Sequence, residues 1–241
     1  MSTPRKIQCT VDRVADHGDR VYTVDLKPLR PVPVFRPGQF LHLTLDDYDP
    51  AGFWPESRVF SIASSPGERA HLRIVYSVKG VYTTRMAQDL CSGMSVWVKM
   101  PYGEFVVDGT TDAVLIAGGT GITAFQAFIE GLVPEHPQKV VLLYGARRPG
   151  LLLGRDMIAE KERTVGNFRA FFVSETGVPI SDQSSGTILP GRTNLDALKD
   201  CAVSDSAVYY LAGPPAMVSA MRVDLEQNGV AEANIRVDAW E

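Results

Sequence analysis

The stretch AVLIAGGTGIT, residues 113–123, decides the fold of the second half of the chain. Its apolar start predicts a short buried strand over Ala113–Ala117, and the glycines of Gly118–Gly121 predict a sharp turn before a helix over Ala124–Leu132. Glycines at such a turn let the backbone approach a pyrophosphate, and the helix N-terminus adds amide donors and a positive dipole. The spacing differs from the GxGxxG fingerprint of dehydrogenases. Two interpretations stay open here: a pyrophosphate-binding turn, or a tight connection that binds nothing.

The same alternation of strands and helices continues after this stretch. Strands that alternate with helices predict βαβ units around a parallel sheet. The stretch Glu175–Arg192 lacks such a pattern and is expected to be a long loop. The further strands are expected at Val140–Tyr144, Phe168–Val173, Ala207–Leu211 and Ile235–Val237, and the further helices at Arg155–Arg163 and Ala216–Gln227.

The first half of the chain has short alternating segments instead. Segments rich in Val, Ile, Thr and aromatic residues, separated by turn residues, predict an antiparallel barrel or sandwich. The strands are expected at Ile7–Val14, Val21–Leu26, Gln39–Leu45, Arg58–Ala63, Leu72–Val78 and Val96–Met100, with one helix at Thr83–Leu90. The change of pattern near Asp108–Asp112 predicts two domains, residues 1–108 and 109–241.

The composition limits the classes of function. The chain has 241 residues, a net charge of −4 and scattered Lys and Arg, so it lacks a basic footprint for nucleic acid. Cys9, Cys91 and Cys201 lie far apart and without CxxC spacing, so neither an iron–sulfur cluster, a zinc site nor a disulfide framework is expected. The sequence shows neither a signal peptide nor a membrane span. We therefore expect a cytoplasmic protein without a bound metal.

Three further stretches offer ligand chemistry. Arg58–Ser61 combines a guanidinium that can bind phosphate, a ring that can stack on a planar ligand, and a hydroxyl. Lys79–Thr83 leads into the helix of the first half, so it is a second candidate for binding a phosphate at a helix N-terminus. Leu211–Met217 places a Gly-Pro-Pro turn after a strand, where α/β sheets bind ligands. Each stretch also has an interpretation without a ligand. In the same order, these are a surface Arg beside a core Phe, an ordinary helix cap and a plain turn.

Taken in order, these motifs resemble those of the ferredoxin–NADP reductase superfamily, including its flavin reductases, over nearly the whole chain. The four main matches are R-x-[YF]-[ST] at 58–61, G-x-x-[ST] at 80–83, GGTGIT at 118–123 and the end of C-G-P-P-x-M at 213–217. Arg36–Phe40, Pro101–Phe105 and Tyr144–Arg147 resemble its PGQ[YF], P-x-G-x-F and YGAR motifs. The resemblance implies a Greek-key-like flavin-binding β-barrel at 1–108, followed by a nicotinamide-binding α/β domain at 109–241.

The resemblance also implies roles for individual residues. Arg58 and the turn Gly80–Thr83 would hold the flavin phosphates, Phe60 would pack on the flavin, and Ser61 would lie near its N5 atom. The residues expected to contact a cofactor are Arg58, Phe60, Ser61, Ile62, Val75, Tyr76, Gly80, Val81, Tyr82, Thr83, Gly118, Gly119, Thr120, Gly121, Ile122, Thr123, Arg147, Ser174, Gly213, Pro214, Pro215 and Met217. Those expected to act in catalysis are Ser61, Asp238 and Trp240, where Trp240 either covers the flavin or closes the sheet edge.

Three positions depart from the family pattern. Phe60 replaces the common Tyr, as in flavin reductases, and removes one hydroxyl contact to the flavin. Ala212 replaces a frequent Cys near the hydride path. Glu175 follows Ser174 where NADPH-selective members carry an Arg, so its charge would repel a 2′-phosphate and favour NADH, unless Arg147, Arg148 or Arg155 compensates.

The expected function is transfer of electrons from NADH or NADPH through bound FAD to a separate acceptor, such as a ferredoxin or an oxygenase component. FAD is favoured over FMN because a pyrophosphate needs more donors than one Arg. The alternative is a flavin reductase that uses free flavin as substrate. A third interpretation, supported by Ala212, is a flavin-binding regulatory subunit without rapid hydride transfer.

Overall fold

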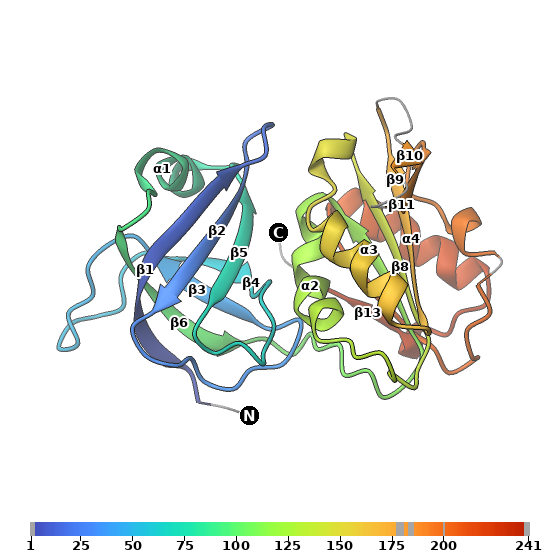
Figure 1. Cartoon of the computed structure of the whole chain (residues 1–241), viewed down its shortest axis with the longest axis horizontal. Coiled ribbons are helices and arrows are strands. Elements are labelled where there is room, and N and C mark those ends of the chain that lie inside the picture. Colours follow the sequence, from blue (N-terminus) through green and yellow to red (C-terminus); the bar gives the residue numbers. More distant parts are fainter. Residues whose placement is uncertain (1–2, 177–180, 183–185, 200, 239–241) are drawn as a thin grey trace. The chain divides into compact units, whose positions relative to one another are not determined.

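The computed structural model describes residues 3–176, 181–182, 186–199 and 201–238 (Figure 1). Its contacts divide the chain into two compact units, Met1–Val106 and Val107–Glu241. Within the described residues, none of the helices has the length and apolarity needed to cross a membrane.

The first unit is an antiparallel barrel. Its sheet has the strand order β4-β3-β6-β1-β2-β5, so neighbours in the sheet are often distant in the chain. The outer strands β4 and β5 also approach each other, which nearly closes the barrel. The amide of Ala63, just after β4, donates to the carbonyl of Arg73 on β5 at 2.9 Å. The elements are β1 (Arg5–Asp16), β2 (Val21–Pro28), β3 (Phe40–Thr44), β4 (Arg58–Ser61), β5 (Leu72–Ser77), α1 (Val81–Asp89) and β6 (Ser95–Tyr102).

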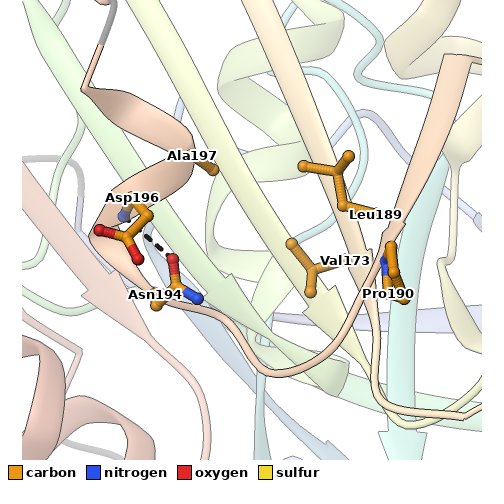
Figure 2. A pocket seen from close by; sticks show the side chains of 6 residues that line it. All are labelled: Val173, Leu189, Pro190, Asn194, Asp196 and Ala197. Atoms are coloured by element: carbon orange, nitrogen blue, oxygen red, sulfur yellow. Dashed lines mark hydrogen bonds between the residues drawn. The ribbon is translucent and has the colours of Figure 1, made fainter.

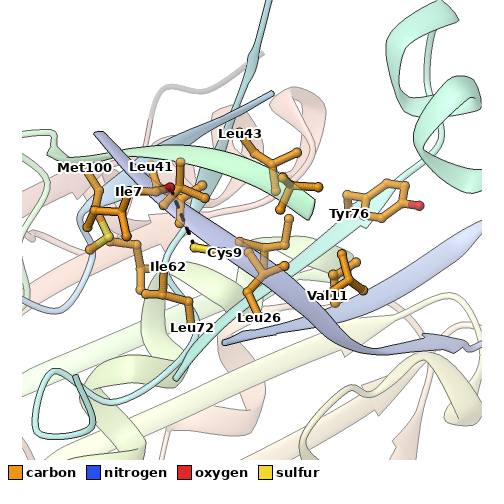
Figure 3. Close-up of a cluster of buried hydrophobic side chains, with 14 of the residues drawn as sticks. Ile7, Cys9, Val11, Leu26, Leu41, Leu43, Ile62, Leu72, Tyr76 and Met100 are labelled. Carbon is orange, nitrogen blue, oxygen red and sulfur yellow. Dashed lines mark hydrogen bonds between the residues drawn. The ribbon is translucent and has the colours of Figure 1, made fainter. Parts of the chain in front are cut away.

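Alternation along the strands builds the barrel core. On β1, Ile7, Cys9 and Val11 are at most 1% exposed, whereas their neighbours are partly or fully exposed. Successive side chains of a strand point to opposite faces, so one face of each strand fills the interior. Figure 3 shows side chains from several strands meeting around Cys9. Burial raises the pKa of the Cys9 thiol to about 12, which makes it an inert core residue.

The second unit is built on a parallel sheet. The order of its strands is β10-β11-β9-β8-β7-β12-β13, and only the short β10 pairs in antiparallel fashion. The strands are β7 (Ala113–Gly118), β8 (Val140–Ala146), β9 (Phe168–Ser174), β10 (Ser181–Asp182), β11 (Gly186–Pro190), β12 (Val208–Ala212) and β13 (Ile235–Val237). The expected order of an antiparallel barrel followed by a parallel α/β sheet is confirmed.

Helices cover both faces of this sheet. Figure 1 shows α2 and α3 together on one face and α4 on the other. Helix α4 packs Met221 and Leu225 against Val114, Leu143 and Leu211 of the sheet. Because both faces are covered, β7 and β8 are buried along their whole length. The helices are α2 (Thr123–Glu130), α3 (Arg155–Thr164) and α4 (Pro215–Gln227), with 3₁₀ turns η1 (Gly119–Ile122), η2 (Pro149–Leu151), η3 (Leu195–Leu198) and η4 (Glu232–Asn234).

The expectation of a long loop over Glu175–Arg192 was wrong for its described part. This part contains β10 and β11, and β11 pairs with β9 through Ile188 opposite Phe172 and Leu189 opposite Val173. Ile188 is 2% exposed, whereas Leu189 and Pro190 are exposed, so the strand buries too few side chains to give a clear pattern. Residues 177–180 and 183–185 of this stretch lie outside the described residues.

Candidate functional site

The order of the parallel strands creates a switch point in the second unit. From β7 the chain moves outward to β8, β9 and β11, and it later returns to place β12 and β13 on the other side of β7. Ligands of open α/β sheets bind beyond the carboxyl ends of the strands where the order reverses. Here these are the ends of β7 and β12, and each runs into one of the predicted glycine turns.

The two glycine turns pack directly against each other. A Cβ at Gly121 would stand 2.3 Å from the carbonyl oxygen of Ala212, and one at Gly118 would stand 2.5 Å from Sδ of Met217. Gly213 has a φ of +153°, and its Cβ would stand 3.0 Å from the amide nitrogen of Gly118. Only glycine allows this approach. The structure therefore brings together two motifs, at 118–121 and 213–217, that lie about 95 residues apart in the sequence.

The turn after β7 leads into α2 without a break. Ile122 is fully buried and anchors the turn, and the hydroxyl of Thr123 donates to the carbonyl of Thr120 at 2.8 Å. Gly119 has a φ of +53°, and no atom lies within 4 Å of the position that a Cβ would take. The backbone at Gly119 thus stands beyond the carboxyl end of β7 with open space beside it, as a phosphate cradle requires.

The turns after β8 and β9 are tied to each other. The carbonyl of Arg147 accepts from the amide of Thr176 at 2.9 Å and from its hydroxyl at 2.8 Å. The hydroxyl of Ser174 donates to the carbonyl of Thr176 at 2.7 Å, and Ser174 is 4% exposed. Ser174 therefore shapes the turn, while the side chain of Arg147 stays exposed. Glu175 points its half-exposed carboxylate outward, 4.0 Å from Nε of Arg192.

A pocket of about 370 Å³ lies where β9 and β11 end (Figure 2). Its lining residues are Val173, Leu189, Pro190, Asn194, Asp196 and Ala197. Figure 2 shows apolar side chains from the strands facing Asn194 and Asp196. The amide of Asp196 donates to the side chain of Asn194 at 2.9 Å, which holds this polar wall in place. The sequence did not indicate this pocket, because β11, which supplies Leu189 and Pro190, was expected to be part of a loop.

In the barrel, Arg58 lies beside the first turn of α1. Its guanidinium lies 4.6 Å from the ring centroid of Tyr82, and it donates to the carboxylate of Glu56 at 2.8 Å and to the carbonyl of Ser57 at 2.9 Å. Such a stack over an aromatic ring is favourable for a cation. Two motifs predicted separately, at 58–61 and 80–83, thus form one cationic corner.

The first turn of α1 adds backbone donors to this corner. The hydroxyl of Thr83 accepts from the amides of Lys79 at 2.9 Å and Gly80 at 3.1 Å. The first bond of the helical ladder runs from the amide of Thr84 to the carbonyl of Gly80 at 2.9 Å. The amides of the first turn have no acceptor within the helix and can therefore face an anion.

The other barrel residues predicted to contact a cofactor differ in exposure. Phe60 and Ser61 are half-buried on β4, and the ring of Phe60 lies 6.1 Å from that of Tyr76. Ile62 and Tyr76 belong to the barrel core at 0% and 3% exposed, and Val75 is 6% exposed. Burial raises the pKa of the Tyr76 phenol far above its ordinary value. Ile62 and Tyr76 can therefore meet a ligand only through their main chain.

The predicted catalytic residues near the C-terminus are partly described. The amide of Asp238 donates to the carbonyl of Leu211 at 2.8 Å, so Asp238 lies beside the end of β12 and the buried Ala212. Trp240 lies outside the described residues. In the part of the chain that the structure describes, no group of three or more His, Cys, Asp or Glu side chains could hold a metal ion.

Comparison with known proteins relates most of the second unit to a described family. Residues 115–223 match the family described as the oxidoreductase NAD-binding domain. These residues begin on β7 and end on α4, so they contain both glycine turns of the switch point.

Similar proteins cover nearly the whole chain. The flavohemoprotein of Rhizobium meliloti is 27% identical over 218 residues, which are 87% of this chain and 54% of that protein. The phenol hydroxylase P5 protein of Acinetobacter pittii is 27% identical over 240 residues, 97% of this chain and 65% of that protein. The crystal structure of an Amycolatopsis cytochrome P450 reductase superimposes with a TM-score of 0.80 at 25% identity, over 99% of this chain and 70% of that one.

The chain thus spans between about half and two thirds of the length of these two curated relatives. The NAD-binding domain match, the likeness across both units and the two paired sets of motifs agree with one another. Residues 115–223 thus carry an oxidoreductase NAD-binding domain, and the chain as a whole is similar to FAD and NAD oxidoreductases of the ferredoxin-reductase type.

Proposed function

We propose that the chain is a flavoprotein reductase that passes electrons from NADH or NADPH, through FAD bound on the barrel unit, to a separate acceptor. One observation carries the proposal: the four main motifs meet in pairs. Arg58 lies against Tyr82 at the start of α1, and Gly121 lies against Ala212 just before the Gly-Pro-Pro turn. Each pair lies at the N-terminus of a helix, where backbone amides can face a phosphate, and a flavin and a nicotinamide dinucleotide each need one such place.

The barrel residues fit FAD. Arg58 and the amides of the first turn of α1 supply both a cation and several donors, which suits a pyrophosphate better than a single phosphate. Phe60 offers a half-buried ring for packing, and Ser61 offers a hydroxyl beside it on the same strand. When bound, FAD accepts a hydride and returns electrons singly or in pairs. The protein would contribute position and electrostatics: Arg58 would hold the phosphates, and Ser61 would offer a hydrogen-bond donor to the flavin.

The second unit fits a dinucleotide at the switch point. We assign the pyrophosphate of the dinucleotide to the backbone of Gly119–Gly121. The nicotinamide is assigned to the place beside Met217 and the Gly-Pro-Pro turn. The exposed carboxylate of Glu175 would repel a 2′-phosphate and so favours NADH. Arg192, 4.0 Å away, reduces this repulsion without removing it, because its side chain is 87% exposed.

The acceptor is proposed to be a protein, either a ferredoxin or an oxygenase component. The matched proteins include the phenol hydroxylase P5 protein and a cytochrome P450 reductase, which supports an acceptor of this kind. Asp238 and Trp240 stay proposed as catalytic residues, and Trp240 lies outside the described residues. The composition, with few cysteines and no disulfide framework, supports a cytoplasmic location.

The test starts from protein purified without added flavin. We expect a flavin absorption spectrum that bleaches when NADH is mixed in anaerobically, and recovery of the colour when an acceptor is added. A colourless protein that oxidises NADH only with free flavin would support the flavin reductase, an alternative that the missing hydroxyl at Phe60 favours. A bound flavin that NADH does not bleach would support the regulatory subunit.

A further inference from the structure

A carboxylate lies in the cationic corner of the barrel that Arg58 and the first turn of α1 form. The carboxylate of Glu56 accepts from Nη2 of Arg58 at 2.8 Å, and both side chains are largely exposed, at 63% and 46%. An exposed ion pair of this kind contributes little to folding stability. Stability therefore does not explain why a carboxylate stands at the Arg expected to bind a phosphate.

Glu56 is held in place from two sides. Its carbonyl accepts a hydrogen bond from the hydroxyl of Tyr82 at 3.3 Å, and Tyr82 is 4% exposed. On the other side, the indole of Trp54 donates to the hydroxyl of Ser57 at 3.0 Å. The backbone around Glu56 is thus fixed to the first turn of α1, and the carboxylate stays within reach of Arg58.

The same guanidinium would have to serve two anions. Nη1 of Arg58 donates to the carbonyl of Ser57 at 2.9 Å and Nη2 donates to Glu56 at 2.8 Å, so two of its five N–H donors are taken, one on each Nη. A phosphate at this corner would therefore share the guanidinium with Glu56, and the nearby carboxylate would oppose it as a like charge.

We propose that Glu56 competes with the flavin phosphate for Arg58 and thereby sets how tightly the barrel retains its flavin. This inference rests on the proposed function. It makes flavin retention adjustable at a position outside the four motifs, two residues before Arg58. Glu56 is a positioning residue here, because it acts through Arg58.

The test measures dissociation constants by the quenching of flavin fluorescence on protein freed of flavin. We expect Glu56→Gln to bind FAD and FMN about three- to tenfold more tightly than the wild type, since a charge is removed at short range in a wet site. Riboflavin, which has no phosphate, should bind both proteins equally. In an Arg58→Ala background, Glu56→Gln should have a much smaller effect, because the competition acts through Arg58.

The matched control is Glu68→Gln. Glu68 is 62% exposed and also pairs with a basic side chain of the barrel, His71, so it tests for a general effect of charge. Unchanged FAD affinity in Glu56→Gln would overturn the inference while leaving the proposed function intact. An equal gain for riboflavin, or an undiminished gain without Arg58, would also overturn it. If the wild-type protein binds neither FAD nor FMN, the proposed function itself is overturned.

Discussion

Gly121 lies so close to Ala212 that a Cβ on the glycine would stand 2.3 Å from the carbonyl oxygen of the alanine. The atom in the way belongs to the backbone, so no change of rotamer can relieve the contact. We predict that Gly121→Ala pushes the two turns apart and weakens NADH binding at least about tenfold, with a loss of about 1–3 kcal/mol in the free energy of unfolding. NADH titration and urea denaturation measure the two effects.

The control for this prediction is Gly150→Ala. Gly150 lies in the same unit, on η2, and no atom stands within 4 Å of the place that its Cβ would take. We expect it to leave NADH affinity and stability unchanged, and the flavin spectrum should be the same in both variants. Wild-type NADH affinity in Gly121→Ala would contradict the assignment of the cradle to the dinucleotide.

The glycine turns show how far the sequence can predict this site. Strand, turn and helix around Gly118–Gly121 follow from local pattern, and the motif order indicates the family. The contact of Gly121 with Ala212 depends on which strands are neighbours, and β7 meets β12 only because the chain returns to the other side of the sheet. Glu56 gave no signal, because an acidic residue in a loop is ordinary composition. The strand at Gly186–Pro190 was missed because it buries too few side chains to show a period.

A second close contact joins Gly145 at the end of β8 to Thr193. A Cβ at Gly145 would stand 1.9 Å from Oγ1 and 3.3 Å from Cβ of Thr193. We predict that Gly145→Ala costs about 1–3 kcal/mol in the free energy of unfolding, and that adding Thr193→Ala restores most of it, because only the hydroxyl is in severe overlap. Thr193→Ser keeps the hydroxyl and should restore little. Equal losses in the single and double variants would mean that the glycine is needed for another reason.

The barrel carries a half-buried carboxylate whose stability contribution depends on pH. Asp25 on β2 accepts from Nε2 of His71 at 2.9 Å and from Nε of Arg73 at 2.8 Å. Burial raises the pKa of Asp25, but these hydrogen bonds outweigh it and hold the pKa below its ordinary value of 3.8. The stabilisation is therefore complete above the ordinary value and is lost as the pH falls through the lower, folded-state pKa.

We predict that Asp25→Asn lowers the free energy of unfolding by about 1–2 kcal/mol at pH 7, since two donors lose a charged acceptor. The difference from the wild type should shrink as the pH falls below the ordinary pKa of Asp25. Urea denaturation at several pH values measures this. Asp12→Asn, which removes an exposed pair with Lys27, should change stability by less than about 0.5 kcal/mol at any pH. A difference for Asp25→Asn that is independent of pH would rule out this origin.

The last prediction concerns the choice between NADH and NADPH. Glu175 follows β9 with a 47% exposed carboxylate, and Arg192 lies 4.0 Å from it. Neutralising the carboxylate removes a repulsion of about 1 kcal/mol at contact in water, so Glu175→Gln should raise kcat/KM for NADPH about three- to tenfold and change the NADH value much less. Arg192→Ala should act in the opposite direction. Glu160→Gln, at the exposed pair with Arg163, should leave the NADPH to NADH ratio unchanged. Equal kcat/KM values for both dinucleotides in the wild type would contradict the predicted preference for NADH.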